Sequence, residues 1–322
     1  PKYGLTNKLP YDLVIVDETS MLSLVMLRQL LEALADDTRV VFIGDHNQLA
    51  SIDAGAVLAD LVSSADLLPS SGITILQANY RFGSAISKVA DAIRTGEVDN
   101  CLAAIDSTDQ VQLIEADPGV GLTELPILAP ALLDWANQLQ KLANASDSAM
   151  ACQVLDATRV LCAHREGPYG AQSWNRQIRR WLSNSLTNYG LESWYLGQPI
   201  MVNANSNQLS SDPLWNGDTG VVVKTANGLR AAIARGSQPL LVAPHLISAA
   251  TELFAMTIHK SQGSQFEQVF VMLPPPDSQL LTKELLYTAV TRAKERLVIY
   301  GSKEWLAAAI QRRAKRASGL AS

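Results

Sequence analysis

The stretch Tyr11-Asp12-Leu13-Val14-Ile15-Val16-Asp17-Glu18 decides the fold class. Its central run is apolar and rich in β-branched residues, which is typical of a buried strand, and two carboxylates follow it immediately. Apolar residues at helical spacing come next, over 21–34, and a second strand is expected at 39–43. Strands that alternate with helices in this way predict a mainly parallel α/β sheet.

The same alternation continues along the chain, with one interruption. Between 197 and 244, short apolar runs separated by Asn-Gly and Gly-Asp turns predict a small antiparallel barrel, with strands at 199–202, 220–223, 229–233 and 240–242. Elsewhere we expect strands at 73–76, 111–114, 159–162, 252–256, 268–273 and 296–300, and helices at 54–61, 84–93, 122–142, 171–186, 282–293 and from 303. A stretch rich in Ser, Leu and Pro at 68–72 marks a domain boundary.

Composition and charge narrow the class of protein. The 322 residues are 48% hydrophobic and 18% charged, as in soluble proteins with about two domains. No apolar run approaches the roughly 18 residues of a membrane helix and no leader opens the chain, so we expect a cytoplasmic protein with no membrane partner. The net charge of −5 is uneven: residues 1–110 hold 7 basic and 15 acidic side chains, and residues 111–322 hold 19 and 16. Three cysteines without a CxxC pair, Cys101, Cys152 and Cys162, are expected to be buried and apolar in character.

Asp17 and Glu18 follow the first strand at the edge where open α/β sheets bind ligands. An aspartate there can hold Mg²⁺, and a glutamate can take the proton of an attacking water. The alternative is a helix N-terminus capped by Asp17, Thr19 or Ser20. The next strand ends in Gly44-Asp45-His46-Asn47-Gln48-Leu49, where a polar amide could sense a terminal phosphate.

Five segments carry a resemblance to superfamily 1 helicases, in the expected order. They are Asp17-Glu18-Thr19-Ser20 (motif II), Gly44-Asp45-x-x-Gln48-Leu49 (motif III), Asn79-Tyr80-Arg81-Phe82-Gly83 (motif IV), Thr257-Ile258-His259-Lys260-Ser261-Gln262-Gly263-Ser264 (motif V) and Tyr287-Thr288-Ala289-Val290-Thr291-Arg292-Ala293 (motif VI). The His-Lys-Ser-Gln-Gly form of motif V points to the 5′→3′ branch. Within that branch, the runs 80–83, 165–170 and 316–321 are similar to the RecD family, the α subunits of the RecBCD exonuclease (exonuclease V).

The resemblance implies an α/β fold of two RecA-like motor domains, the first of them incomplete, with a small SH3-like β-barrel inserted in the second. The first domain would span 1–70, the second 71–196 and 250–322, and the insertion 197–249. The implied protein is an ATP-dependent 5′→3′ DNA helicase subunit that acts on single-stranded DNA, in double-strand break repair, recombination and DNA degradation. Its implied partners are RecB and RecC.

The resemblance also assigns roles to matching residues at the ATP site. Asp17 would bind Mg²⁺, Glu18 would be the general base, and Gln48 would touch the γ-phosphate. Arg81 and Arg292 would reach the same phosphate, since a guanidinium is always charged and can pair bidentately. Tyr80 and Gln265 would contact the nucleotide, although Gln265 stands where the family usually has Glu and so keeps the hydrogen bonding but loses the charge. Without these motifs, both arginines could be ordinary solvated side chains.

The predicted DNA contacts come from motif V. Its hydroxyl, amide, ring and ammonium groups suit phosphate oxygens and bind without sequence preference, and they belong to Thr257, His259, Lys260, Ser261 and Gln262. The alternative is a simple loop in which Gly263 permits the turn. The basic and aromatic stretch from Arg165 to Arg180 could also face single-stranded DNA. Alternatively its residues at helical spacing, Trp174, Ile178, Trp181 and Leu182, belong to the core.

One part of the motor is missing from the sequence. The chain contains no Gly-Lys dipeptide and therefore no phosphate-binding loop of the form G-x-x-x-x-G-K-[ST]. In the family this loop lies far upstream of the acidic pair, so we expect the chain to be the C-terminal part of a longer polypeptide that does not hydrolyse ATP alone. Three alternatives stay open: a single-stranded DNA-binding module without catalysis, a subunit-docking module, and a stand-alone RecD-like helicase.

Overall fold

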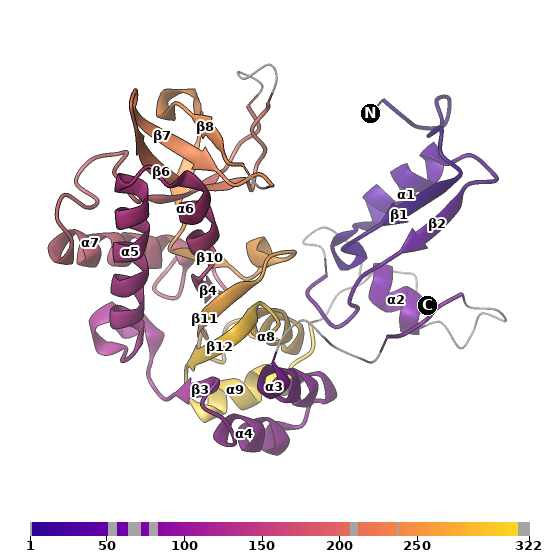
Figure 1. Ribbon diagram of the computed structural model, residues 1–322. Helices are drawn as coiled ribbons and strands as arrows, with labels where there is room; N and C mark the ends of the chain where they lie inside the picture. The colour runs from indigo at the N-terminus through magenta and orange to yellow at the C-terminus, as the bar shows by residue number, and fades with distance from the viewer. Residues whose placement is uncertain are drawn as a thin grey trace.

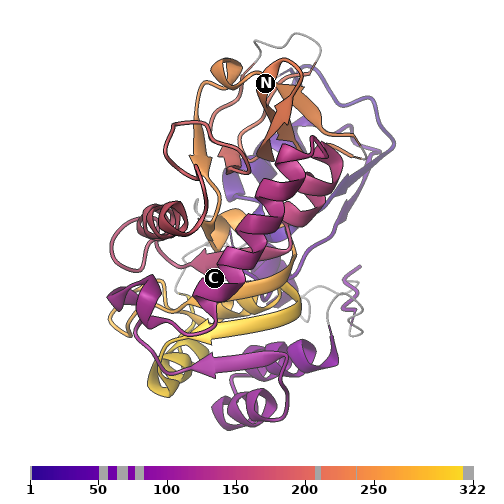
Figure 2. The same ribbon diagram turned by 60° about the vertical axis from the view of Figure 1, so that its left-hand side comes forward.

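The computed structural model describes residues 2–50, 57–63, 72–76, 83–206, 212–236 and 238–314. Within these residues the strands form a two-stranded parallel pair, a five-stranded parallel sheet and a five-stranded antiparallel sheet. Figure 1 shows the pair at one side, the parallel sheet with its helices below, and the antiparallel sheet above. Figure 2 shows the same arrangement turned, with α5 (Leu128–Asn144) in front of the sheets. The expected α/β class with a parallel sheet is confirmed.

The two-stranded pair contains the segment that opened the sequence. β1 (Leu13–Val16) pairs in parallel with β2 (Arg39–Phe42), and α1 (Leu24–Ala33) connects them. Ser23 caps α1 by accepting the backbone N–H of Met26, and α2 (Val57–Ser63) lies near the turn after β1. The strand expected to be buried is half-exposed, because Leu13 and Ile15 on one face are 50% and 58% exposed.

The parallel sheet has helices on both faces. Its strand order is β10 (Ala255–Thr257), β4 (Thr158–Cys162), β11 (Phe266–Met272), β12 (Ala293–Tyr300) and β3 (Val111–Ile114). One face packs on α3 (Ser84–Thr95), α4 (Val98–Asp106), α8 (Lys283–Val290) and α9 (Lys303–Gln311), and the other on α5 (Leu128–Asn144), α6 (Ser148–Leu155) and α7 (Ala171–Ser185). Side chains alternate between the faces: Val269 and Val271 point to the α8 side, and Phe270 and Met272 to the α5 side.

The antiparallel sheet packs on the far side of α5 and α6. Its order is β8 (Leu240–Val242), β7 (Gly228–Ile233), β6 (Thr219–Thr225), β5 (Pro199–Val202) and β9 (Ala250–Glu252). Val221 and Val223 join the cluster around α5, whereas Val222 faces a separate small core. The antiparallel element expected between 197 and 244 is therefore present, and its SH3-like character stays a prediction.

Several expected elements differ from the structure. Residues 72–76 have no regular secondary structure, so the strand at 73–76 is wrong. The helix expected from 122 is a 3₁₀ turn followed by α5 from Leu128, because Pro126 disfavours helix at the residue before it. The strand expected at 252–256 is divided between β9 and β10, which belong to different sheets. The helices α4 and α6 were not expected.

The three cysteines are buried free thiols, which confirms the expectation from the sequence. Burial raises the pKa of Cys101 and of Cys152 to about 12, so both thiols stay protonated near neutral pH. Among the helices that the structure describes, none is both long and apolar enough to cross a membrane.

Candidate functional site

The acidic pair lies in a tight turn at the end of β1. Asp17 is exposed, and its Oδ1 accepts the backbone N–H of Glu18 at 2.8 Å. Glu18 has a left-handed backbone conformation (φ 49°, ψ 41°), which is uncommon for a residue with a side chain. A short 3₁₀ helix, Thr19–Met21, follows, and no side chain in the described residues caps it. The helix-cap interpretation of the acidic pair is therefore wrong.

The turn after β2 packs against this acidic turn. The backbone N–H of Thr19 donates to the carbonyl of Ile43 at 2.9 Å. A Cβ on Gly44 would lie 3.0 Å from the nitrogen of Thr19 and 3.1 Å from that of Ser20, so glycine alone permits this close approach. The carboxyl ends of β1 and β2 thus bring motifs II and III together, as neighbouring parallel strands should.

Asp45 orders the segment that follows Gly44. Its Oδ1 accepts the backbone N–H of Asn47 at 2.9 Å and the side-chain amide of Asn47 at 3.2 Å. Its Oδ2 accepts the Nε2 of Gln48 at 3.4 Å. The Oε1 of Gln48 is buried and, within the described ranges, has no hydrogen-bond partner. The amide of Gln48 therefore has unused hydrogen-bonding capacity, which a bound ligand could satisfy.

Leu49 joins the β2 turn to the parallel-sheet unit. Its side chain is 3% exposed and belongs to the core cluster on the α8 side of the sheet. Its backbone N–H donates to Thr288 Oγ1 at 2.8 Å, and its carbonyl accepts Gln262 Nε2 at 2.7 Å. One residue of motif III is thus held by one residue each of motifs V and VI.

Two further contacts tie the same motifs together. Burial raises the pKa of the Tyr287 hydroxyl, and the charge of Asp45 and the hydrogen bond to it raise this pKa further. The Glu18 carboxylate faces Gly263, because its Oε1 lies 4.0 Å from where a Cβ on Gly263 would stand. The acidic turn therefore lies beside the glycine of motif V.

Arg292 is buried at the junction between motifs V and VI. It is 5% exposed, and its guanidinium donates to the carbonyls of Thr288 and Ser264, both at 3.1 Å, and to Thr291 Oγ1 at 3.2 Å. The alternative of a solvated surface arginine is therefore wrong. Gln265 is nearby, and its Nε2 donates to the carbonyl of Thr291 at 3.5 Å.

The five residues predicted to contact DNA occupy the segment after β10. Ser261 is fully buried and donates to the carbonyl of Ile258 at 2.7 Å, and Gln262 is engaged with Leu49. Thr257 Oγ1 accepts the backbone N–H of Lys260, while His259 is half-buried. Hydrogen bonds within the chain thus hold part of this segment in shape, and Lys260 is its exposed member.

Lys260 lies in a cationic surface that the sequence only partly indicated. Its Nζ donates to Asn203 Oδ1 at 3.4 Å, next to the end of β5. Burial lowers the pKa of Lys260, and the nearby positive charge of Arg165 lowers it further. Neither cation forms an ion pair with an acidic side chain in the part of the chain that the structure describes. Arg165 follows β4, the neighbour of β10, which explains the proximity of the two charges.

Other residues predicted to bind nucleotide or DNA lie outside the described residues or in the core. Tyr80 and Arg81 lie outside the described residues. Trp174, Ile178 and Leu182 are fully buried in α7, so this part of the basic and aromatic stretch is core and does not face DNA.

A divalent cation would find a partial site at the acidic turn. Within the described ranges, no three His, Cys, Asp or Glu side chains converge as metal ligands do. Magnesium commonly binds through one or two carboxylates, waters and the phosphates of a nucleotide. The exposed carboxylate of Asp17 fits a metal that arrives with a nucleotide, and not one held by the protein alone.

Two family models match parts of the chain. One, described as an AAA domain, matches residues 4–117. The other, described as a UvrD-like helicase C-terminal domain, matches residues 252–300. The second match includes Gln262 and Thr288, which bind Leu49, and Gly263, which lies beside Glu18.

Curated relatives match nearly the whole chain. The "RecBCD enzyme subunit RecD" of Mycolicibacterium smegmatis is 47% identical over 99% of this chain and 55% of the relative. The "ATP-dependent RecD2 DNA helicase" of Deinococcus radiodurans is 27% identical over 95% of this chain and 39% of the relative. A crystal structure of Bacteroides Pif1 bound to single-stranded DNA is 15% identical, with a TM-score of 0.48 over 91% of this chain and 72% of that one. The resemblance to RecD is confirmed, and the chain spans about half the length of the curated relatives it matches.

Proposed function

The chain is homologous to RecD subunits over nearly its whole length, and we propose that it forms the C-terminal part of the motor of an ATP-dependent 5′→3′ DNA helicase subunit. In this proposal, residues 1–70 belong to the first RecA-like domain, and residues 71–196 and 250–322 form the second. The antiparallel sheet within 197–249 is the SH3-like insertion.

The observation that supports this proposal best is the position of Leu49. Its backbone is hydrogen-bonded to both Gln262 and Thr288, so motifs III, V and VI meet at one residue. The Glu18 carboxylate faces Gly263 at the same junction. Segments more than two hundred residues apart in sequence thus come together at one junction, which supports a shared nucleotide site there.

The nucleotide would bind at the carboxyl ends of β1 and β2. Asp17 would hold Mg²⁺ together with the phosphates, Glu18 would accept the proton of the attacking water, and Gln48 would contact the γ-phosphate. Arg292 would supply positive charge beside the phosphates. Bound Mg²⁺–ATP supplies the phosphoanhydride bond whose cleavage drives the motor. The roles of Tyr80, Arg81 and Gln265 come from the resemblance alone.

Single-stranded DNA would bind across the carboxyl ends of β4 and β10. The exposed Lys260 and Arg165 lie close together without acidic partners in the described chain, which favours a phosphate between them. The motif V residues Thr257 and His259 flank this point, and Ser261 and Gln262 would shape the loop. Binding of this kind follows the DNA backbone and carries no sequence preference.

The partner subunits would be RecB and RecC, and the process double-strand break repair and DNA degradation. The higher identity to a subunit named after RecBCD, 47% against 27% for RecD2, favours the complex over a stand-alone helicase. Co-purification with RecB and RecC tests this assignment, and a stable, fully active single polypeptide would contradict it.

These 322 residues alone would not turn over ATP, because they contain no Gly-Lys phosphate-binding loop. The test compares ATP turnover by this chain with that of a polypeptide that carries an upstream G-x-x-x-x-G-K-[ST] segment from the same reading frame. We expect turnover stimulated by single-stranded DNA only in the longer polypeptide, and Glu18→Gln should abolish it. Turnover by the 322 residues that Glu18→Gln abolishes would contradict the proposal.

DNA binding is tested separately by a salt titration. Affinity for an oligo-dT strand should fall steeply as salt rises, and Lys260→Ala should reduce the slope of log K against log salt by about 0.7. Lys224→Ala is the matched control, since Lys224 is an exposed lysine on β6. Equal slopes of log K against log salt for the two variants would show that Lys260 does not contact the DNA phosphates. Binding without DNA-stimulated turnover in the longer polypeptide would favour the non-catalytic module.

A further inference from the structure

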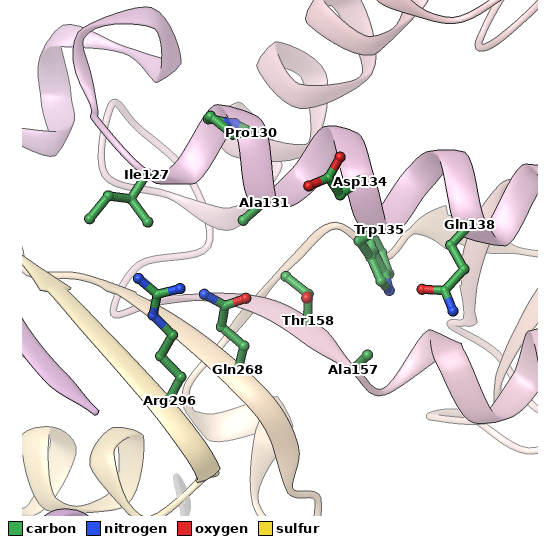
Figure 3. Close-up of a pocket in the computed structure, with 10 residues that line it drawn as sticks. All are labelled: Ile127, Pro130, Ala131, Asp134, Trp135, Gln138, Ala157, Thr158, Gln268 and Arg296. Carbon is green, nitrogen blue, oxygen red and sulfur yellow. The ribbon is translucent and has the colours of Figure 1, made fainter. Parts of the chain in front are cut away.

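A cavity of about 420 Å³ lies between α5 and the N-terminal halves of three strands of the parallel sheet. Thr158 of β4, Gln268 of β11 and Arg296 of β12 line its floor (Figure 3). Ile127 and Ala131, at the start of α5, line its roof. None of these residues has a role in the proposed motor.

The three floor residues form one row across the sheet. Gln268 pairs in register with Thr158 on one side and with Arg296 on the other. Because residues in register share a face, all three side chains point toward α5. Figure 3 shows the Arg296 guanidinium and the Gln268 amide side by side, both directed at the roof of the cavity.

Two of these side chains have unused donors. The Nε2 of Gln268 is buried and lacks a hydrogen-bond partner among the described residues. Arg296 is half-buried and makes neither a hydrogen bond nor an ion pair with any side chain or carbonyl in the described chain. A buried donor without a partner, next to an uncompensated guanidinium, is costly unless an acceptor with negative charge binds there.

The part of the roof at the start of α5 is apolar and held in place, and Asp134 and Gln138 line the cavity farther along the helix. The Tyr300 hydroxyl donates to the carbonyl of Pro126, which fixes the chain just before α5. Ile127 has a positive φ of 72°, a rare conformation for a β-branched residue, and its side chain lines the cavity. Asp134 is the acidic member of the lining, and Figure 3 shows it on α5, across the cavity from Arg296 and Gln268.

The cavity is on the opposite face of the sheet from the proposed nucleotide junction. Leu49 and Tyr287 pack on the α8 side, whereas the cavity opens on the α5 side. A ligand in the cavity would therefore not compete with nucleotide. The strands nevertheless connect the two places, since Gln268 follows Gln265 and Arg296 follows Arg292 by a few residues.

We propose that this cavity is a carboxylate-binding site, in which Arg296 and Gln268 donate to the two carboxylate oxygens and the Thr158 hydroxyl completes the polar floor. Ile127 and Ala131 in the roof would contact the methylene carbons attached to the carboxylate. The ligand class is a short aliphatic carboxylate, either a free dicarboxylic acid or the glutamate side chain of a polypeptide. The proposal does not depend on the motor function.

The test is NMR titration of the whole chain with two probes, glutarate and a capped peptide with a single glutamate. The side-chain resonances of Arg296 Nε–H and Gln268 Nε2–H₂ report directly on the floor. We expect saturable shifts of both, with at least about a tenfold loss of affinity in Arg296→Gln. Gln268→Glu should also abolish binding, because it places a negative charge against the ligand. If glutarate alone saturates the site, the ligand is a free dicarboxylic acid. If the peptide binds more tightly, the ligand is the glutamate side chain of a polypeptide.

Lys294→Gln is the matched control, since Lys294 is an exposed cation on the same strand that does not line the cavity. It should bind both probes as the parent does. Thermal unfolding of each variant establishes that the fold is retained. The absence of saturable shifts with either probe, or equal affinity in Arg296→Gln and the parent, would overturn the proposal.

Discussion

Gly44 is the residue whose missing side chain lets the two strand-end turns touch. A methyl group there would press on the nitrogens of Thr19 and Ser20 and on the side chain of Leu58. We expect Gly44→Ala to lower the free energy of unfolding by about 1–3 kcal/mol, the usual cost of overpacking. Urea denaturation measures this change. Gly72→Ala is the control, because no atom of the described residues lies within 4 Å of the added carbon. Equal losses of stability in both variants would show that the two turns do not pack closely at Gly44.

Glu252 is a partly buried carboxylate at the end of β9. Its side chain is 13% exposed, it accepts the Tyr195 hydroxyl at 2.7 Å, and it lies 3.5 Å from Arg179. Burial raises the pKa of Glu252 above its ordinary value of 4.5, and the hydrogen bond and the arginine oppose this rise only in part. The native state therefore binds this proton more tightly than the unfolded chain does.

The tighter binding of this proton in the native state makes the free energy of unfolding depend on pH. The contribution of Glu252 to stability is largest below its ordinary pKa of 4.5 and is lost as the pH rises through the raised, folded value. Glu252→Gln keeps the hydrogen-bonding shape and removes the titration. We therefore expect the unfolding free energy of the parent to fall relative to that of the variant as the pH rises from about 4 to 7. Urea denaturation across this range measures it, and a pH-independent difference would contradict the assignment.

At the scale of elements, α7 completes the edge of the parallel sheet. Asn175 Oδ1 accepts the backbone N–H groups of Phe254 and Ala255 at 2.9 and 2.8 Å, and its Nδ2 donates to the carbonyl of Ala255 at 2.8 Å. The side chain thus replaces a neighbouring strand beside β10. Since β10 leads directly into motif V, α7 positions the proposed DNA-binding loop.

Asn175→Ala should weaken the attachment of α7 to β10 at the edge of the parallel sheet. Loss of the amide leaves buried backbone groups unpaired, so we expect a destabilisation of about 1–3 kcal/mol. Hydrogen exchange at Phe254 and Ala255 should become faster. Asn175→Asp, which keeps the acceptor and loses the donor, should fall between the parent and the alanine variant. Unchanged exchange at both amides in Asn175→Ala would show that α7 does not hold β10.

Element types were largely predictable from the sequence, and sheet membership was not. The alternation of apolar runs and helical patterns correctly placed β3, β4 and α3, because period and residue type are local properties. The division of 252–256 between two sheets depends on partners distant in sequence, and no local pattern encodes it. For the same reason the motifs located the candidate site, whereas Asn203 beside Lys260 and the burial of Leu49 required the fold.

At the scale of the whole molecule, one apolar surface is conspicuous. The face of the β1–β2 pair that carries Leu13, Ile15 and Val41 is 42–58% exposed at these positions. Large apolar patches on an open strand pair favour association with another copy.

We therefore expect this chain to self-associate as its concentration rises. Ile15→Lys should shift the population toward monomer, because it places a charge in the middle of that face. Sedimentation velocity over a concentration series measures the change. Leu241→Lys serves as the control, since Leu241 is a similarly exposed apolar residue on β8. A monomeric parent, or equal behaviour of both variants, would contradict the expectation.

The burial of Leu49 also sets a thermodynamic scale for any movement between the β1–β2 pair and the parallel sheet. Separating the two units would withdraw this side chain from a core in which it is 3% exposed, at a cost of about 1.5–3 kcal/mol. This side chain alone would favour the joined arrangement over the separated one by roughly 10- to 150-fold. Such a ratio lies within the range that the differential affinity of a single ligand can reverse, so the burial of this one leucine would not by itself prevent a ligand from separating the two units.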